Sequence, residues 1–116
     1  MMALGPATRV FLATGATDLR KSFEGLSDAV RHQVKEDPLS GHLFVFANRR
    51  KTRLKILYWD GSGLWVCAKR LEQGCFSWPR TADTAAVRVA AEELTLLLSG
   101  MDVEKTSVRE WWRRAA

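Results

Sequence analysis

Residues 53–70 read RLKILYWDGSGLWVCAKR. Two runs rich in aromatic and β-branched residues flank Asp60-Gly61-Ser62-Gly63, which carries the glycines and the short polar residues of a tight turn. The pattern predicts a β-hairpin formed by Arg53–Trp59 and Leu64–Arg70, with Trp59 opposite Leu64.

Two similar runs flank this hairpin. Leu43–Ala47 precedes it, and residues 75–78 follow it after the weaker turn signal Gln73-Gly74. Together the four runs predict a four-stranded antiparallel meander, which a first strand at Val10–Ala13 could extend. The loop at residues 48–52 then places Ala47 opposite Arg53, and the loop at residues 71–74 places Arg70 opposite Cys75.

An amphipathic helix is predicted between the first strand and the meander. Thr17 or Asp18 can cap its first turn, and it ends before Asp37-Pro38 because proline disfavours helical geometry in the residue before it. Apolar residues recur at helical spacing along one stripe: Leu19, Phe23, Leu26, Val30 and Val34.

A short C-terminal helix is predicted around Leu94, Leu97 and Leu98, with Gly100 as its stop signal. The segment before it has two interpretations, a short strand at residues 87–89 or a longer helix that Asp83 caps and that runs through to Leu98. The fold class is therefore α+β, with one helix packed on a face of an antiparallel sheet.

The predicted register assigns side chains to the two sheet faces, because they alternate along each strand. One face forms a core under the amphipathic helix: Phe44, Phe46, Leu54, Ile56, Tyr58, Trp65, Cys67, Phe76 and Trp78. The other face is mixed: Val45, Leu57, Trp59, Leu64, Val66 and Ala68, with Arg53, Lys55 and Arg70. A register shift of one residue would exchange these faces.

Length and composition predict one globular domain over residues 1–116. The chain has 116 residues, of which 47% are hydrophobic and 27% charged, with a net charge of +5. Residues 42–80 contain eight Lys/Arg and only two Asp/Glu, whereas residues 1–41 contain five of each. A local excess of this kind attracts polyanions.

We therefore expect phosphate contacts from a basic hairpin. The candidate nucleic-acid-binding residues are Arg49, Arg50, Lys51, Arg53, Lys55, Lys69 and Arg70, with Arg20 and Lys21 as a second site. A soluble hairpin tip beside a charge-protected edge strand explains the first group as well, and solvated side chains explain the second. Most aromatic residues are predicted to be buried on the opposite face, so base stacking is not expected.

The sequence offers no catalytic or metal-binding pattern. Cys67 and Cys75 have no metal-ligand spacing, and we expect both to be free thiols. Acidic residues are scattered, and Asp60 is explained as a turn residue. No cofactor and no membrane span is expected, and the N-terminal residues do not resemble an export signal, so a cytoplasmic location is expected.

Several motifs resemble one protein family in uninterrupted order. They are ATGATDLRKSFEGL at residues 13–26, DPLSGHLFVF at 37–46, Arg49-Arg50, KILYWDG at 55–61, KRLE at 69–72 and Trp78-Pro79. Over residues 9–102 the chain resembles the TnpB accessory proteins of insertion-sequence-66-type elements. Residues 103–116, with Trp111 and Trp112, lie outside the resemblance.

The resemblance implies a bacterial protein of transposition, encoded beside a larger transposase, with no catalytic residues to carry over. The functional candidates among the motif residues are Asp18, Arg20, Lys21, Arg49, Arg50, Lys55, Lys69 and Arg70. The first hypothesis is a non-catalytic DNA-binding accessory protein. The alternatives are a subunit that docks on the transposase without touching DNA and a metal-dependent nuclease.

Leftover apolar surface leads to an expectation about assembly. The second sheet face and the tryptophan tail predict a symmetric homodimer that uses one of them as its interface. A monomer whose tail folds back over that face is the alternative.

Overall fold

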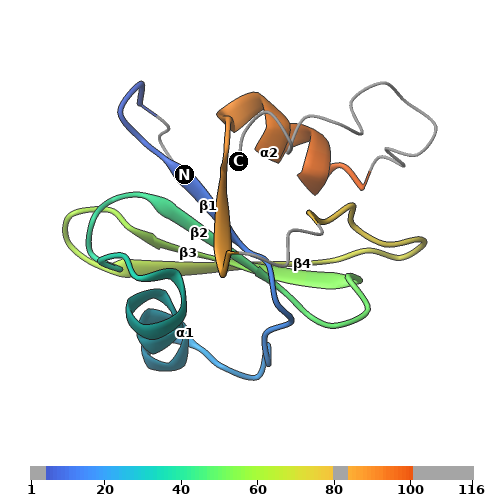
Figure 1. Ribbon diagram of the computed structural model, residues 1–116, viewed down its shortest axis with the longest axis horizontal. Helices are drawn as coiled ribbons and strands as arrows, with labels where there is room; N and C mark the ends of the chain where they lie inside the picture. The colour runs from blue at the N-terminus through green and yellow to red at the C-terminus, as the bar shows by residue number, and fades with distance from the viewer. Residues whose placement is uncertain (1–4, 80–83, 101–116) are drawn as a thin grey trace.

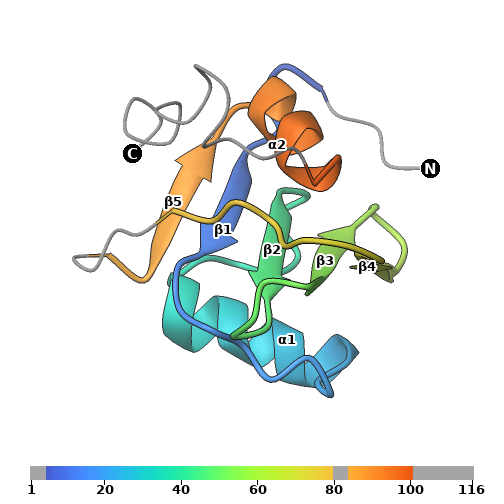
Figure 2. The same cartoon turned by 90° about the vertical axis from the view of Figure 1, so that its right-hand side faces the viewer.

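The computed structural model describes residues 5–79 and 84–100. It has an α+β fold in which one five-stranded sheet separates two helices (Figures 1 and 2). The strands are β1 (Val10–Ala13), β2 (Leu43–Ala47), β3 (Arg53–Trp59), β4 (Leu64–Arg70) and β5 (Ala86–Val89). The helices are α1 (Phe23–Ala29), continued by a π-helical turn η1 (Val30–Val34), and α2 (Ala91–Leu98).

The strand order is β4-β3-β2-β1-β5. β2, β3 and β4 form an antiparallel meander, β1 pairs in parallel with β2, and β5 pairs antiparallel with β1. The predicted first strand does extend the sheet, and residues 87–89 belong to a strand that is followed by a separate helix. The tail with Trp111 and Trp112 lies outside the described residues.

The predicted four-stranded meander is wrong in its last strand. Residues 75–78 do not join the sheet edge; they cross the face that α2 covers, where Phe76 and Trp78 are buried. The Trp78 indole N–H donates to the Ala13 carbonyl at 2.8 Å. Crossing the sheet buries both aromatic side chains almost completely, which a place at the edge of the sheet would not do.

The predicted register between β2 and β3 is wrong by one residue. Ala47 lies opposite Leu54, because Asn48 pairs with Arg53 and shortens the loop to residues 49–52. Asn48 Oδ1 also accepts the backbone N–H groups of Thr52 and Arg53 at 3.0 and 3.1 Å. The hairpin between β3 and β4 has the predicted register, with Trp59 opposite Leu64.

This shift moves Phe44 and Phe46 to the face on which Arg53, Lys55 and Arg70 lie. That face is covered by α1, and its core contains Phe11, Ala13, Leu26, Ala29, Val30, Phe44, Phe46 and Leu57. The expectation that helix and cations lie on opposite faces is therefore wrong. The aromatic rings on the cationic face are nevertheless inaccessible, since Phe44 and Phe46 are fully buried.

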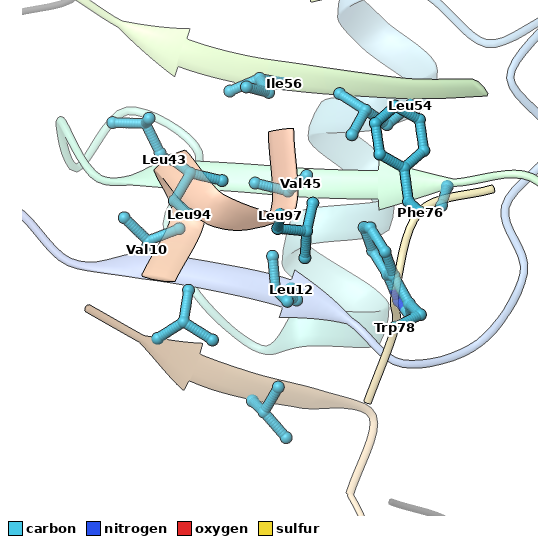
Figure 3. Close-up of a cluster of buried hydrophobic side chains, with 13 residues drawn as sticks. Val10, Leu12, Leu43, Val45, Leu54, Ile56, Phe76, Trp78, Leu94 and Leu97 are labelled. Atoms are coloured by element: carbon cyan, nitrogen blue, oxygen red, sulfur yellow. The ribbon is translucent and has the colours of Figure 1, made fainter. Parts of the chain in front are cut away.

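The other face carries the larger core, shown in Figure 3. Leu94 and Leu97 of α2 pack with Phe76 and Trp78 over β1, β2, β3 and β5. The expected second face of Val45, Leu57, Trp59, Leu64 and Val66 does not exist as one surface, because Val45 lies on the α2 side and Leu57 on the α1 side. The homodimer remains a prediction, but its interface cannot be the complete set of residues that the sequence grouped on that face.

The first helix is shorter than predicted. Residues 17–22 form a loop, α1 begins at Phe23 after Ser22, and η1 ends at Val34 before Lys35 adopts a left-handed conformation with φ 65°. Leu26 and Val30 of the predicted stripe are fully buried, but Phe23 is 47% exposed. Trp65, predicted to lie in the core, is 42% exposed.

Candidate nucleic-acid interface

Arg53 and Arg70 lie directly opposite each other on β3 and β4. Thr52 and Leu71 are the next pair, and the Leu71 N–H donates to the Thr52 carbonyl at 2.9 Å. Antiparallel ladders alternate between hydrogen-bonded and non-bonded pairs, so Arg53 and Arg70 form a non-bonded pair with Cα atoms about 4.5 Å apart. Their side chains leave the same face, and like charges in this position repel each other.

Acidic residues do little to relieve this repulsion. A carboxylate oxygen of Glu72 accepts from the Arg70 guanidinium at 3.3 Å, but 63% and 81% of the two side chains are exposed, so the pair is weak. In the described part of the chain, Arg53 has no ion pair. Its charge is therefore available to an external anion.

Lys55 extends the cationic surface along β3 toward α1. It lies two residues after Arg53 on the same face, and its ammonium group donates to the Lys21 carbonyl at 2.9 Å. The contact holds the segment before α1 against the sheet. Lys21 and Lys55 are thereby placed together although they are 34 residues apart in the chain.

The loop between β2 and β3 presents Arg49 and Arg50 at the same end of the sheet. The Asn48 hydrogen bonds fix the loop, and both arginines are exposed without an ion pair to any described residue. The Thr17 N–H donates to the Ala47 carbonyl at 2.9 Å, so the loop before α1 also lies beside this end.

We call the surface formed by Lys21, Arg49, Arg50, Arg53, Lys55 and Arg70 the basic face. Its backbone is held by the β3–β4 ladder and by the Asn48 turn. The three other predicted candidates are Lys51, Lys69 and Arg20. The two lysines lie outside this surface, and a neighbouring carboxylate balances the charge of Arg20.

Lys51 is directed away from the basic face. Its ammonium lies 5.6 Å from the centroid of the Trp78 ring, on the α2 side, and desolvation lowers the pKa of this lysine. The residue has φ 58°, and its carbonyl accepts from the Phe76 N–H at 2.6 Å. Lys51 therefore joins the hairpin to the segment that crosses the sheet.

Lys69 also lies on the α2 side, since it alternates with Arg70 along β4. Its ammonium donates to the Leu98 carbonyl at 2.6 Å, at the last residue of α2. A cation at a helix C-terminus satisfies a free carbonyl and interacts favourably with the helix dipole. The structure thus gives Lys69 a role in stabilising α2.

Arg20 is bound by Asp18 in the loop before α1. The guanidinium donates two nearly parallel hydrogen bonds, Nε to Oδ1 at 3.0 Å and an Nη to Oδ2 at 2.8 Å. These bonds lower the pKa of Asp18 to about 2 and raise that of Arg20. The Arg20 side chain is 92% exposed, but a neighbouring carboxylate balances its charge.

Sequence reasoning did not identify Phe23 as a surface residue. It follows Lys21 by two positions, at the start of α1, and is exposed. Its spacing fits the apolar stripe, so the sequence carried no signal for its exposure; the later start of the helix accounts for it.

An open hollow lies on the α1 face of the sheet, next to the part of that face that α1 covers. It has a volume of about 660 Å³ and lies between β5 and the end of η1. Lys35 and Arg88 contribute charge, but its described lining contains no Asp, Glu, His or Cys. These residues supply no general acid–base pair, so the hollow is a weaker candidate than the basic face.

The described residues contain no cluster of three or more His, Cys, Asp or Glu side chains that could hold a metal ion. Cys67 and Cys75 are free thiols. Asp60 is a turn residue, as expected, since its carboxylate accepts the backbone N–H groups of Ser62 and Gly63. No helix among residues 5–79 and 84–100 has the length and apolar character to cross a membrane.

Comparison with known proteins identifies the family. The model of the IS66 Orf2-like proteins matches residues 8–108, which is most of the chain. The chain belongs to the IS66 Orf2-like family. It is thus a member of the TnpB group of insertion sequences that its motifs resemble, and we describe it below as an IS66 Orf2-like protein.

Two relatives come from Sinorhizobium fredii (strain NBRC 101917 / NGR234). The uncharacterized protein y4hO is 40% identical over 113 residues, which cover 97% of this chain and 96% of the relative. The uncharacterized protein y4jC is 39% identical over 101 residues, covering 85% and 86%. No solved structure matches the chain.

Proposed function

We propose that this IS66 Orf2-like protein is a non-catalytic accessory factor of insertion-sequence transposition that binds duplex DNA through its basic face. The observation that carries the proposal is the opposed pair Arg53 and Arg70, with no ion pair to Arg53 in the described residues. A phosphate between the two guanidinium groups would turn their repulsion into two charge-assisted contacts. Family membership supports the transposition context.

The surroundings favour recognition of the phosphate backbone over the bases. Phe44 and Phe46, the aromatic residues of β2 on this face, are fully buried under α1. Lys and Arg contacts to phosphate give affinity that depends on salt and only weakly on sequence. We therefore propose a factor that holds element DNA while the transposase performs the chemistry.

A pair of matched double variants tests this proposal. Arg53→Ala/Arg70→Ala removes two charges from the basic face, and Arg9→Ala/Arg88→Ala removes two exposed charges elsewhere, including one on β5 at the opposite sheet edge. Affinity for two unrelated duplexes is measured across a salt series by fluorescence anisotropy. Thermal unfolding of each variant checks the fold.

The first variant should weaken binding to both duplexes alike, and the slope of log affinity against log salt should become shallower by about 2. The control should leave the slope nearly unchanged. Equal slopes for both variants would remove Arg53 and Arg70 from the interface. Capture of the transposase without any affinity for DNA would replace the proposal with a docking function, and metal-dependent cleavage would replace it with a nuclease.

The loop arginines are a separate part of the proposed site. Arg49→Ala/Arg50→Ala removes two exposed side chains without touching a described hydrogen bond. Affinity should fall and the salt slope should flatten, as for the strand pair, with no change in melting temperature. Unchanged affinity would limit the interface to the strands.

A further inference from the structure

β4 is an exposed edge strand of seven residues. β5, at the opposite edge of the sheet, has four. In Figure 2 no described strand or helix lies beyond β4 on the side away from β3. Proteins usually protect such edges with proline, a bulge or a charge in the middle of the strand. β4 has none of these, since its two charges, Lys69 and Arg70, are at its end.

The backbone hydrogen bonds at the two ends of the β3–β4 hairpin determine which backbone groups of β4 point outward. The Leu71 N–H donates to Thr52, and the Asp60 N–H donates to Gly63, so odd-numbered residues 63–71 bond to β3 or to the turn. Alternation along the strand directs the N–H and C=O groups of Leu64, Val66, Ala68 and Arg70 away from β3, where no strand among residues 5–79 and 84–100 pairs with them.

The side chains of β4 are apolar on both faces of its first part. Leu64 and Val66 are half-buried on the α1 side, while Trp65 is exposed and Cys67 half-buried on the α2 side. The Trp65 indole N–H donates to the Asp60 carboxylate at 2.8 Å, which fixes the exposed ring. This end of the edge therefore offers apolar contact surface on both sides.

We propose that β4 pairs antiparallel with β4 of a second copy of this chain, about a two-fold axis at Cys67. The sequence around Cys67 is complementary to itself, because the axis places the partner's Lys69 beside Trp65 and the partner's Arg70 beside Leu64. The cations of the two copies are thus kept apart, and each exposed Trp65 has the partner's Lys69, not another aromatic ring, as its cross-strand neighbour. A partner strand with cations at its middle would not fit.

Hydrogen bonding selects the same arrangement. Val66 pairs with the partner's Ala68 through outward N–H and C=O groups, and Leu64 pairs likewise with the partner's Arg70. Cys67 then faces the partner's Cys67 as a non-bonded pair, with Cα atoms about 4.5 Å apart. That separation is within the range of a disulfide bond.

The axis is perpendicular to the sheet, so both copies present α1 and the basic face on the same side. If the proposed DNA-binding function holds, the dimer binds one duplex at two places. The dimer itself does not depend on that function, and its test uses no DNA.

Oxidative cross-linking tests the interface and its register. Cys75→Ser protein is treated with diamide, which takes two electrons and two protons from two Cys67 thiols as they form a disulfide and is itself reduced to the hydrazide. The expected product, on a non-reducing gel, has twice the 13.1 kDa mass of the chain and disappears with dithiothreitol. Light scattering without oxidant should also give the dimer mass at micromolar concentration.

The Cys67→Ser variant keeps only Cys75, which is the more exposed thiol. Its cross-linking rate therefore gives the contribution of random collisions between molecules. It should cross-link at least several-fold more slowly than Cys75→Ser. Faster or equal cross-linking through Cys75 would overturn the interface.

Ala68→Pro in the Cys75→Ser background removes an outward N–H and leaves the β3–β4 ladder intact. It should give the monomer mass and no cross-link, whereas Ala68→Thr, which keeps the N–H, should dimerise. Equal cross-linking of the two variants, or a monomer mass for Cys75→Ser at every concentration, would show that β4 does not pair with a second copy.

Discussion

Asp18 and Arg20 form an ion pair, so the Arg20 charge is balanced before any external anion arrives. The carboxylate accepts the Arg20 backbone N–H at 3.0 Å as well as the guanidinium hydrogen bonds, so the pair closes a small turn before α1. Sequence analysis grouped Arg20 with Lys21 as one cationic site. The structure separates them, because only Lys21 is joined to the basic face through Lys55.

The pair predicts an acid transition that can be followed directly. The folded pKa of Asp18, about 2, lies below its ordinary value of 3.8, so the stabilisation from the pair is present above about pH 4 and is lost as the pH falls toward 2. NMR titration of the Asp18 carboxyl carbon should show this midpoint. Arg20→Ala should return it toward 3.8, while Lys21→Ala, which removes the smallest contribution, should change it little. An Asp18 midpoint that is the same with and without the Arg20 side chain would contradict the hydrogen-bonded pair.

Trp78 is the buried residue whose polar atom joins two distant parts of the chain. Its indole N–H and the Ala13 carbonyl are partners across 65 residues. Trp78→Phe keeps most of the apolar volume but leaves that buried carbonyl without this donor, which should cost about 1–3 kcal/mol in unfolding free energy. Urea denaturation measures the loss. Trp65→Phe, at an exposed ring, is the comparison and should cost less; the reverse order would contradict the buried hydrogen bond.

At the scale of elements, α2 depends on β4 for its C-terminal cap. Lys69→Met removes the ammonium from the Leu98 carbonyl while keeping the alkyl chain, and should destabilise the protein by about 0.5–1 kcal/mol. Hydrogen exchange should accelerate in the last turn of α2, and Lys69→Arg should restore most of the protection. DNA affinity should fall less than for Arg53→Ala. An equal fall would place Lys69 in the interface.

The elements also show how far the sequence predicts this fold. Periodicity and turn residues located β1, β2, β3, β4 and the C-terminal helix, because those signals are local. The β2–β3 register was missed because Asn48 occupies a ladder position that its residue type does not reveal. Residues 75–78 alternate as an edge strand would, and only the tertiary packing of Phe76 and Trp78 distinguishes the two outcomes.

The sequence predicts the composition of the candidate site but only part of its arrangement. The cationic excess of residues 42–80 is visible in the sequence, and the alternation of Arg53, Lys55 and Arg70 on a common face follows from the correctly predicted β3–β4 hairpin. The removal of Lys51 and Lys69 to the other side depends on contacts with Trp78 and Leu98, which are distant in the chain. No local pattern contains that information.

At the scale of the whole molecule, protection is graded across the sheet. Every residue of β1 and β2 is buried. In β4 none is buried: Leu64, Val66 and Cys67 are half-buried, and the other four residues are exposed. Amide hydrogen exchange of dilute protein should therefore be slowest in β1 and β2 and fastest, among the strands of the meander, at the outward amides of β4. Mass spectrometry of peptides from each strand measures this order. Exchange in β4 as slow as in β2 at every dilution would contradict it.

The position of β1 has a consequence for the nascent chain. Among the described strands β1 is synthesised first and β5 last, yet the two are neighbours in the sheet. At a synthesis rate of about 5–20 residues per second, the interval between the end of β2 and the end of β5 is about 2–8 s. Throughout that time one side of β1 has no strand beside it, and the meander itself can form only after Arg70 has been made. The growing polypeptide therefore exposes one edge of β1, and the five-stranded sheet can be completed only after Val89 has been made.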